Sequence, residues 1–318
     1  MKAIVLKENG GVENLILSKV EIPKIKSNEV LVRVKAISIN PVDAFARQNK
    51  QTVQAILKPT NENEVIILGW DISGTVEEVG KDVKDFKKGD DVFGMVNFVG
   101  QGKAYSEFVA APANQLALKP KNISFEEAAA ATLAALTAWQ ALVNICKVKK
   151  GDKVLIHAAG GGVGHYAVQI AKSFGAYVIG TASSAKRNFV LQLGADEFID
   201  YTSEKFERKV KDADIVLDSI TGSDHLLCSL ESVKNGGKVV SLKSSAEGKI
   251  ADMIKEKNIF FQRVMVRSNG EDMKHIAKLL EEGKIHSNIS QKFSFKDLPK
   301  AHQQIETGKT RGKIVVVL

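Results

Sequence analysis

The sequence predicts an α/β fold in which a parallel sheet, covered by helices on both faces, interrupts a second, β-rich domain. Three patterns predict it: an apolar run that breaks into glycines at 154–164, a strand and helix alternation over 153–242, and short β segments throughout the first 120 residues. The chain has 318 residues, of which 44% are hydrophobic and 26% charged, so two domains with separate cores are expected.

The N-terminal region has short β patterns separated by Gly, Pro, Asn and Lys-Gly-Asp turn signals. The expected strands are 1–6, 29–39, 71–79 and 91–95. A capping-box pattern at Ser124–Glu127 then leads into an alanine-rich stretch, which predicts a helix over 128–143.

The middle of the chain alternates strand and helix patterns, as is typical of a parallel sheet between two helical layers. The expected strands are 153–157, 177–180, 197–199, 213–218 and 238–242, and the expected helices are 164–174, 185–192 and 224–232. Beyond them the sequence predicts an edge strand at 260–266, a helix at 272–282 and a closing strand at 313–318. The expected domains are therefore 1–122 plus 270–318, with 123–269 inserted between them.

The turn after the strand at 153–157 has the pattern of a nucleotide site. Small residues there let the chain turn tightly, let the main chain approach a pyrophosphate and let helix pack on strand, and Ala159, Gly161 and Gly164 occupy those three places. The first is alanine, so the strict fingerprint is not met, and a plain flexible turn is the alternative. The expected phosphate cradle consists of Gly160, Gly161, Gly162, Val163 and Gly164.

The residues about twenty positions after this turn indicate which dinucleotide is bound. An acid there would bind the adenosine ribose hydroxyls and favour NAD, but residues 180–187 contain none, and the next acid is Asp196. Lys186 and Ser183 can instead meet a 2′-phosphate by charge and by hydroxyl, which predicts NADPH. The alternative is that Lys186 and Arg187 form only the solvated first turn of a helix.

Composition excludes several other classes of protein. The net charge is +8, but the basic residues are dispersed among acids, as in 81–88, which is typical of a solvated surface rather than a nucleic-acid interface. Cys146 and Cys228 are too few for a disulfide framework or a four-thiolate zinc site. The apolar stretch 128–143 is too short for a membrane span and no signal-peptide core precedes it, so we expect a cytoplasmic protein.

Two long blocks resemble the medium-chain dehydrogenase/reductase superfamily. They are the segment 69–94, which begins Gly-Trp-Asp-Ile-Ser-Gly, and the segment 157–164. Together with Asn40-Pro-Val-Asp43 and the ending at 310–315, they make the whole chain similar to the zinc-free quinone oxidoreductase and enone reductase branch.

The resemblance implies a GroES-like domain built from both chain ends, a Rossmann domain in the middle and an active cleft between them. It also implies a homodimer paired through the edge strand at 260–266, for which an ordinary capped edge is the alternative. It places Tyr201 near the adenosine end of the cofactor. Toward the nicotinamide half it places Thr137, Ser219, Leu242, Val264, Met265 and Val266. For Thr137, helix capping is the alternative.

Zinc alcohol dehydrogenases carry a cysteine near the Asn40 position, a histidine near Trp70 and a four-cysteine lobe around 95–105, and this sequence has none of these ligands. No metal is therefore expected. Without zinc, hydride addition to an activated C=C bond is easier to support than alcohol oxidation, because the acceptor's own carbonyl takes the developing charge as an enolate.

The resemblance implies three residues for the substrate side. Asn40 would lie beside the nicotinamide, although an Asn-Pro turn capped by its own side chain explains it equally well. Trp70 would form an apolar wall for a flat substrate, or belong to the core. Tyr105 is a candidate proton donor, with a strand role or delivery from solvent as alternatives. Phe45 and Gln51 stand where quinone reductases often carry tyrosines.

These observations predict an NADPH-dependent, zinc-independent reductase of α,β-unsaturated carbonyls, that is, of enones and alkenals. One-electron reduction of quinones on the same scaffold is the first alternative. A non-catalytic NADPH-binding protein that binds RNA is the second, and only the positive charge supports it.

Overall fold

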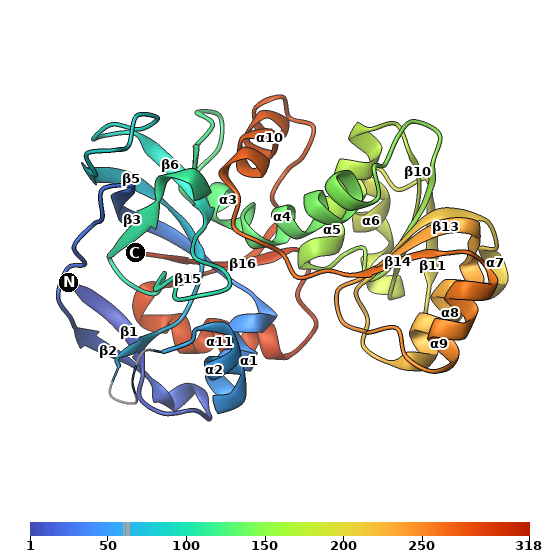
Figure 1. Ribbon diagram of the computed structural model, residues 1–318, viewed down its shortest axis with the longest axis horizontal. Helices are drawn as coiled ribbons and strands as arrows, with labels where there is room; N and C mark the ends of the chain where they lie inside the picture. The colour runs from blue at the N-terminus through green and yellow to red at the C-terminus, as the bar shows by residue number, and fades with distance from the viewer. Residues whose placement is uncertain (60, 62–63) are drawn as a thin grey trace. The chain divides into compact units, whose positions relative to one another are not determined.

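The computed structural model describes residues 1–59, 61 and 64–318 and divides the chain into two compact units. Unit 1 contains Met1–Leu136 and Arg267–Leu318, and unit 2 contains Thr137–Val266. Both ends of the chain, marked N and C in Figure 1, therefore belong to unit 1. The sequence predicts the two boundaries between the units at 123 and 269.

Unit 1 is built on β-sheets, as expected. A three-stranded antiparallel sheet has the order β2-β1-β4, and a seven-stranded sheet has the order β15-β16-β3-β5-β6-β8, with β7 paired to β3. The strands are β1 (Lys2–Leu6), β2 (Leu15–Lys19), β3 (Glu29–Ile39), β4 (Ile66–Ile67), β5 (Asp71–Val79), β6 (Asp91–Met95), β7 (Phe108–Pro112), β8 (Ala117–Leu118), β15 (Ile289–Ser294) and β16 (Lys313–Val317). Residues from both chain ends meet in the larger sheet, where β16 pairs antiparallel with β3.

The helices of unit 1 are α1 (Pro41–Gln48), α2 (Lys50–Ile56), α3 (Phe125–Ala130), α10 (Gly270–Glu281) and α11 (Leu298–Glu306), and α4 (Leu133–Trp139) crosses into unit 2. The helix expected over 128–143 is therefore divided into α3, α4 and a π-helical segment, Gln140–Ile145. The hydroxyl of Thr132 donates to the carbonyl of Ala129 at 2.8 Å, and such local side-chain bonds compete with helix continuation. The carboxylate of Asp71 accepts the N–H of Leu133 at 3.0 Å, which starts α4 separately.

Unit 2 contains the parallel sheet that the alternation predicts. Its strands are β9 (Lys153–Ile156), β10 (Tyr177–Ala182), β11 (Glu197–Asp200), β12 (Ala213–Asp218), β13 (Val233–Ser241) and β14 (Phe260–Arg263). Its helices are α5 (Gly162–Ser173), α6 (Arg187–Gln192), α7 (Phe206–Lys209), α8 (Ser223–Ser232) and α9 (Lys249–Glu256). In Figure 1, α5 and α6 cover one face of the sheet and α7, α8 and α9 the other. The expected strand at 260–266 ends at Arg263.

The strand order in unit 2 is β11-β10-β9-β12-β13-β14, and every pairing is parallel. The chain winds outward from β9 through β10 to β11, then returns to β12 on the other side of β9. In such sheets, ligands bind outside the carboxyl ends of the strands where the winding direction reverses. The turn after β9 and the residues after β12 lie at that point, so the fold brings them to one edge.

No helix in the part of the chain that the structure describes is both long and apolar enough to cross a membrane.

Candidate functional site

The turn between β9 and α5 leaves the start of the helix open. Ala158 has a left-handed backbone, with φ of 49°, and its carbonyl accepts the N–H of Gly161 at 2.8 Å. Gly161 is the N-cap of α5 and offers no side chain to its first turn. The first backbone N–H groups of α5 are therefore not capped by a side chain, and a helix N-terminus of this kind binds anions such as phosphate.

The small residues of the turn are required by close backbone packing. A Cβ added at Gly164 would lie 2.2 Å from the carbonyl oxygen of Ala158 and 2.7 Å from Cα of Ala159, and both are backbone atoms that cannot turn away. The methyl group of Ala159 faces Gly180 on β10, where a Cβ would lie 2.9 Å from it. Alanine can thus replace the first glycine of the fingerprint because β10 supplies a glycine opposite.

Lys186 lies against the same turn. A Cβ added at Gly160 would come within 2.9 Å of Cδ and 3.3 Å of Cβ of Lys186, so the aliphatic part of this lysine packs over the glycine. Ser183 begins the short 3₁₀ turn that carries Lys186 and accepts its N–H at 2.9 Å. A lysine and a serine therefore follow β10 close to the open N-terminus of α5, and a positive charge and a hydroxyl are groups that can bind a phosphate.

The other charged residues that follow the glycine turn in the sequence interact with different partners. Asp196, the first acid after the turn, pairs with Lys172 of α5 at 2.8 Å and accepts the N–H of Val178 at 2.7 Å. The guanidinium of Arg187 lies over the ring of Phe198, 5.4 Å from its centre. Asp200, at the end of β11, accepts the hydroxyl of Thr202 at 2.7 Å.

The other expected cofactor residues follow the ends of the same strands, with one exception. Ser219 comes directly after β12, and its hydroxyl donates to the carbonyl of His157 at 3.0 Å. Leu242 follows β13 and its N–H bonds to Asp218 at 2.8 Å, while Val264 follows β14 and its N–H bonds to Ser241 at 2.8 Å. Further residues at this edge are Met265 (58% exposed), Val266 (buried) and Tyr201 (59% exposed), which follows β11. Thr137, the exception, is a buried residue of α4.

The three substrate-side candidates belong to unit 1 and take part in its interior. Asn40 is 1% exposed, and both ends of its amide are bonded. Its Nδ2 donates to Asp71 Oδ2 at 2.7 Å, and its Oδ1 accepts from the ammonium of Lys313 at 2.5 Å. The ammonium of Lys313 also lies 3.9 Å from Asp71 Oδ2, so a buried ion pair holds the amide. Asp71 lies on β5 and Lys313 on β16, far from Asn40 along the chain, so the sequence alone does not point to them as its partners.

Tyr105 is fully buried, and its hydroxyl bonds to Nε2 of His302 at 2.9 Å. Burial and the neighbouring carboxylates raise the pKa of this hydroxyl well above its usual value. Burial also raises the pKa of Asp43 to about 8, although the N–H of Asn40, at 2.6 Å, opposes that shift. Burial lowers the pKa of His302 to about 3, and the charge of Arg47 adds to this effect. Asp43 and His302 thus flank the tyrosine, and burial favours the neutral form of both.

Trp70 is also fully buried. Its Nε1 donates to the carbonyl of Gly100 at 2.8 Å, and its ring meets Phe98 edge to face with centres 5.1 Å apart. A Cβ added at Gly102 would lie 2.6 Å from its Cδ1. The indole therefore fixes the loop around 98–102 within unit 1.

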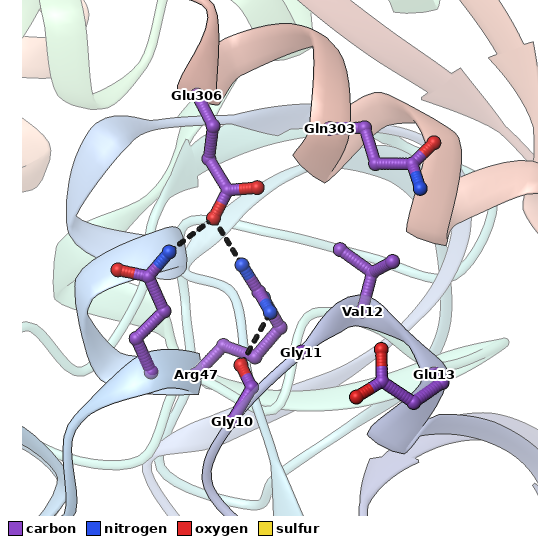
Figure 2. Close-up of a pocket in the computed structure, with 8 residues that line it drawn as sticks. Gly10, Gly11, Val12, Glu13, Arg47, Gln303 and Glu306 are labelled. Atoms are coloured by element: carbon purple, nitrogen blue, oxygen red, sulfur yellow. Dashed lines mark hydrogen bonds and ion pairs between the residues drawn. The ribbon is translucent and has the colours of Figure 1, made fainter.

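A hollow of about 570 Å³ lies at the surface of unit 1, between the Gly10–Gly11 turn and the last turns of α1 and α11. Figure 2 shows the guanidinium of Arg47 between the carbonyl of Gly10 and the carboxylate of Glu306, and it bonds to both. The side chain of Arg47 is 2% exposed and that of Glu306 28%. The arginine thus joins α1, α11 and the turn, which is a structural role.

Within residues 1–59, 61 and 64–318, no three or more His, Cys, Asp or Glu side chains are grouped so that they could hold a metal ion. Burial raises the pKa of the Cys146 thiol to about 12, so this cysteine is not a thiolate nucleophile at neutral pH.

Comparison with known proteins decides the family. Residues 26–121 match the family described as alcohol dehydrogenase GroES-like domain, and residues 193–316 match the family described as zinc-binding dehydrogenase. The chloroplastic NADPH-dependent alkenal/one oxidoreductase of Arabidopsis thaliana is 36% identical over 326 residues, which cover 99% of this chain and 79% of the relative. The chain belongs to the medium-chain dehydrogenase/reductase superfamily. Membership of this superfamily confirms the predicted fold class, and it confirms the prediction that the protein is an oxidoreductase.

Two solved structures place this medium-chain dehydrogenase/reductase more closely. The quinone oxidoreductase of Coxiella burnetii has a TM-score of 0.91 and 36% identity, covering 100% of this chain and 99% of the other. The quinone oxidoreductase of Escherichia coli complexed with NADPH has a TM-score of 0.85 and 29% identity, covering 100% of both chains. One family description above names zinc, but the described residues of this chain do not fit a zinc site. The chain belongs to the zinc-free branch that the sequence predicts.

Proposed function

We propose that this protein reduces the activated C=C bond of enones and alkenals with NADPH, by hydride transfer and without zinc. The observation that carries the proposal is the packing of Lys186 on Gly160, beside a helix N-terminus that no side chain caps. The name of the Arabidopsis relative, which specifies both NADPH and alkenals, supports it.

The residues that would hold the cofactor lie along one edge of the unit 2 sheet. The first N–H groups of α5 would bind the pyrophosphate, and Ser183 and Lys186 would bind the 2′-phosphate. Ser219, Leu242 and residues 264–266 would line the nicotinamide half. When bound there, NADPH supplies a hydride.

Asn40 would contribute a hydrogen bond to the acceptor. A carboxamide nitrogen carries two hydrogens, and Asp71 accepts one of them, at 2.7 Å. Lys313 donates to the amide oxygen and polarises the group toward stronger donation. The remaining N–H would donate to the carbonyl oxygen of the substrate, on which enolate charge develops. The proton would come from solvent, because the hydroxyl of Tyr105 is already bonded to His302.

The quinone oxidoreductases among the solved structures support a second candidate, one-electron reduction of quinones. The two activities can be separated by following NADPH oxidation with a linear alkenal and with a naphthoquinone at matched concentrations. We expect turnover of the alkenal and formation of the saturated aldehyde. Turnover of the naphthoquinone alone would refute the proposal and favour the second candidate. Absence of turnover on both, with NADPH still bound, would indicate a non-catalytic binding protein.

We also propose that two copies pair through β14. This strand is one edge of the unit 2 sheet, and its first residue, Phe260, is 46% exposed. An unpaired apolar edge is a site for strand pairing. Light scattering should give the mass of a dimer for the wild type and that of a monomer for Phe260→Glu. A monomeric wild type would refute this pairing.

A further inference from the structure

His157 is a buried polar residue at the centre of the dinucleotide edge. It follows β9 directly, precedes the left-handed Ala158 of the glycine turn, and is 1% exposed. Its ring packs against Phe206 and His225, with centres 4.4 Å and 4.5 Å away. A buried imidazole in this position needs a partner for each nitrogen.

The hydrogen bonds around the ring determine which nitrogen carries the proton. The hydroxyl of Ser229 donates to the carbonyl of His225 at 3.0 Å, so its oxygen is left to accept from Nε2 of His157 at 3.2 Å. Nδ1 then accepts the hydroxyl of Thr181 at 3.1 Å. The neutral His157 ring with its proton on Nε2 can make both of these hydrogen bonds at once. Burial, together with His225, holds the pKa of His157 well below its usual value, in agreement with this neutral form.

These bonds join three segments that are separate in the sequence. Thr181 is on β10, close before Ser183 and Lys186, and Ser229 is on α8. The backbone of His157 adds two more bonds, since its N–H donates to Leu217 at 3.1 Å and its carbonyl accepts the hydroxyl of Ser219 at 3.0 Å. One residue therefore connects the glycine turn, the end of β10 and the end of β12.

We propose that His157 is a positioning residue for the cofactor: its neutral ring and its carbonyl hold the phosphate turn, the Ser183–Lys186 turn and Ser219 in register with one another. The inference rests on the proposed function, because it assumes that a dinucleotide binds along this edge. It adds a residue that would act without touching the ligand. A preformed site binds more tightly because less ordering is needed on binding.

The test compares His157→Phe with His157→Gln and with a matched control. Phenylalanine keeps the size and aromatic packing of the ring but removes both side-chain bonds, whereas the glutamine amide can accept from Thr181 and donate to Ser229. His302→Phe is the control, because His302 is equally buried, makes one side-chain bond and lies in unit 1. The measurements are the Kd for NADPH by fluorescence titration of the folded protein, the Tm, and KM for NADPH against kcat.

We expect both phenylalanine variants to lower the Tm, but only His157→Phe to raise the Kd and KM for NADPH, by about tenfold, with partial recovery in His157→Gln. Ser229→Ala removes one bond with little loss of packing; it should raise the Kd by about threefold, and serves as the test if His157→Phe does not fold. An unchanged Kd in the folded His157 or Ser229 variants, with normal binding by the wild type, would overturn the inference alone. A wild type that does not bind NADPH would overturn the proposed function as well.

Discussion

Replacing Lys186 with glutamate is a direct test of the proposed cofactor. The aliphatic part of Lys186 packs on Gly160, in the turn that would hold the phosphates, so its ammonium would be within reach of the 2′-phosphate. A charge-assisted hydrogen bond contributes about 1.5–3 kcal/mol, and each 1.4 kcal/mol corresponds to about tenfold in affinity. We therefore expect the KM and Kd for NADPH to rise by roughly 10- to 150-fold.

The assay measures both cofactors, because NADH lacks the 2′-phosphate. The KM for NADH should stay within about twofold of the wild-type value, because NADH has no contact with Lys186 to lose. The preference for NADPH over NADH should therefore fall by about as much as the affinity for NADPH. Lys211→Glu is the matched control: it makes the same change of charge at an exposed position just before β12, at the opposite edge of the sheet. Equal losses for NADPH and NADH, or equal losses in the two variants, would show that Lys186 does not bind the 2′-phosphate.

Further predictions concern stability and pH. Gly164→Ala should lower the free energy of unfolding by about 1–3 kcal/mol in urea denaturation, since its Cβ would lie 2.2 Å from a backbone oxygen; an unchanged midpoint would contradict the packing described here. Arg47→Met should cost about 3 kcal/mol in the same assay, because it leaves the carboxylate of Glu306 without its buried partner, whereas a loss under 1 kcal/mol would indicate a solvated pair. The pKa of Asp43 is raised from 3.8 to about 8, so between these pH values the folded state holds a proton that the unfolded state releases. The free energy of unfolding should therefore fall as pH rises through this window. In urea denaturation, Asp43→Asn should show a less steep fall than the wild type. The pKa of His302 is lowered to about 3 from 6.5, so its contribution is lost as pH falls below 6.5, and His302→Phe should lessen that loss in urea midpoints taken from pH 4 to 7.

The sequence was most informative where the determining contacts are local. Strand β9, the turn and α5 follow one another without interruption, and β10 with Lys186 comes next, so their order alone indicates a dinucleotide site. Even so, the sequence does not explain why alanine is accepted at position 159, because this depends on the lack of a side chain at Gly180 on the neighbouring strand. The division of the helix expected over 128–143 was missed for the same reason, since Asp71 of β5 helps to set it.

Unit 1 was harder to predict because its interior joins distant parts of the chain. The amide of Asn40 is held by Asp71 and by Lys313, which lie 31 and 273 residues away. A single sequence shows the Asn-Pro-Val-Asp turn but not the ion pair behind it. Helices α1 and α11 were not expected either, although the buried Arg47 joins them.

This difference explains why the cofactor can be predicted with more detail than the substrate. The residues proposed to recognise the 2′-phosphate lie within one strand–turn–helix segment and the strand after it, so a change there would be visible in the sequence. The proposed donor to the substrate is the second hydrogen of the Asn40 amide, whose direction is set by Asp71 on one side and Lys313 on the other. Lys313 is buried and donates to the amide oxygen, so replacing it with methionine would leave only the bond to Asp71 to orient the Asn40 amide, although Asn40 itself would be unchanged. Under the proposed function, substrate choice would therefore depend on the contacts that fix the orientation of Asn40 as much as on the presence of this residue.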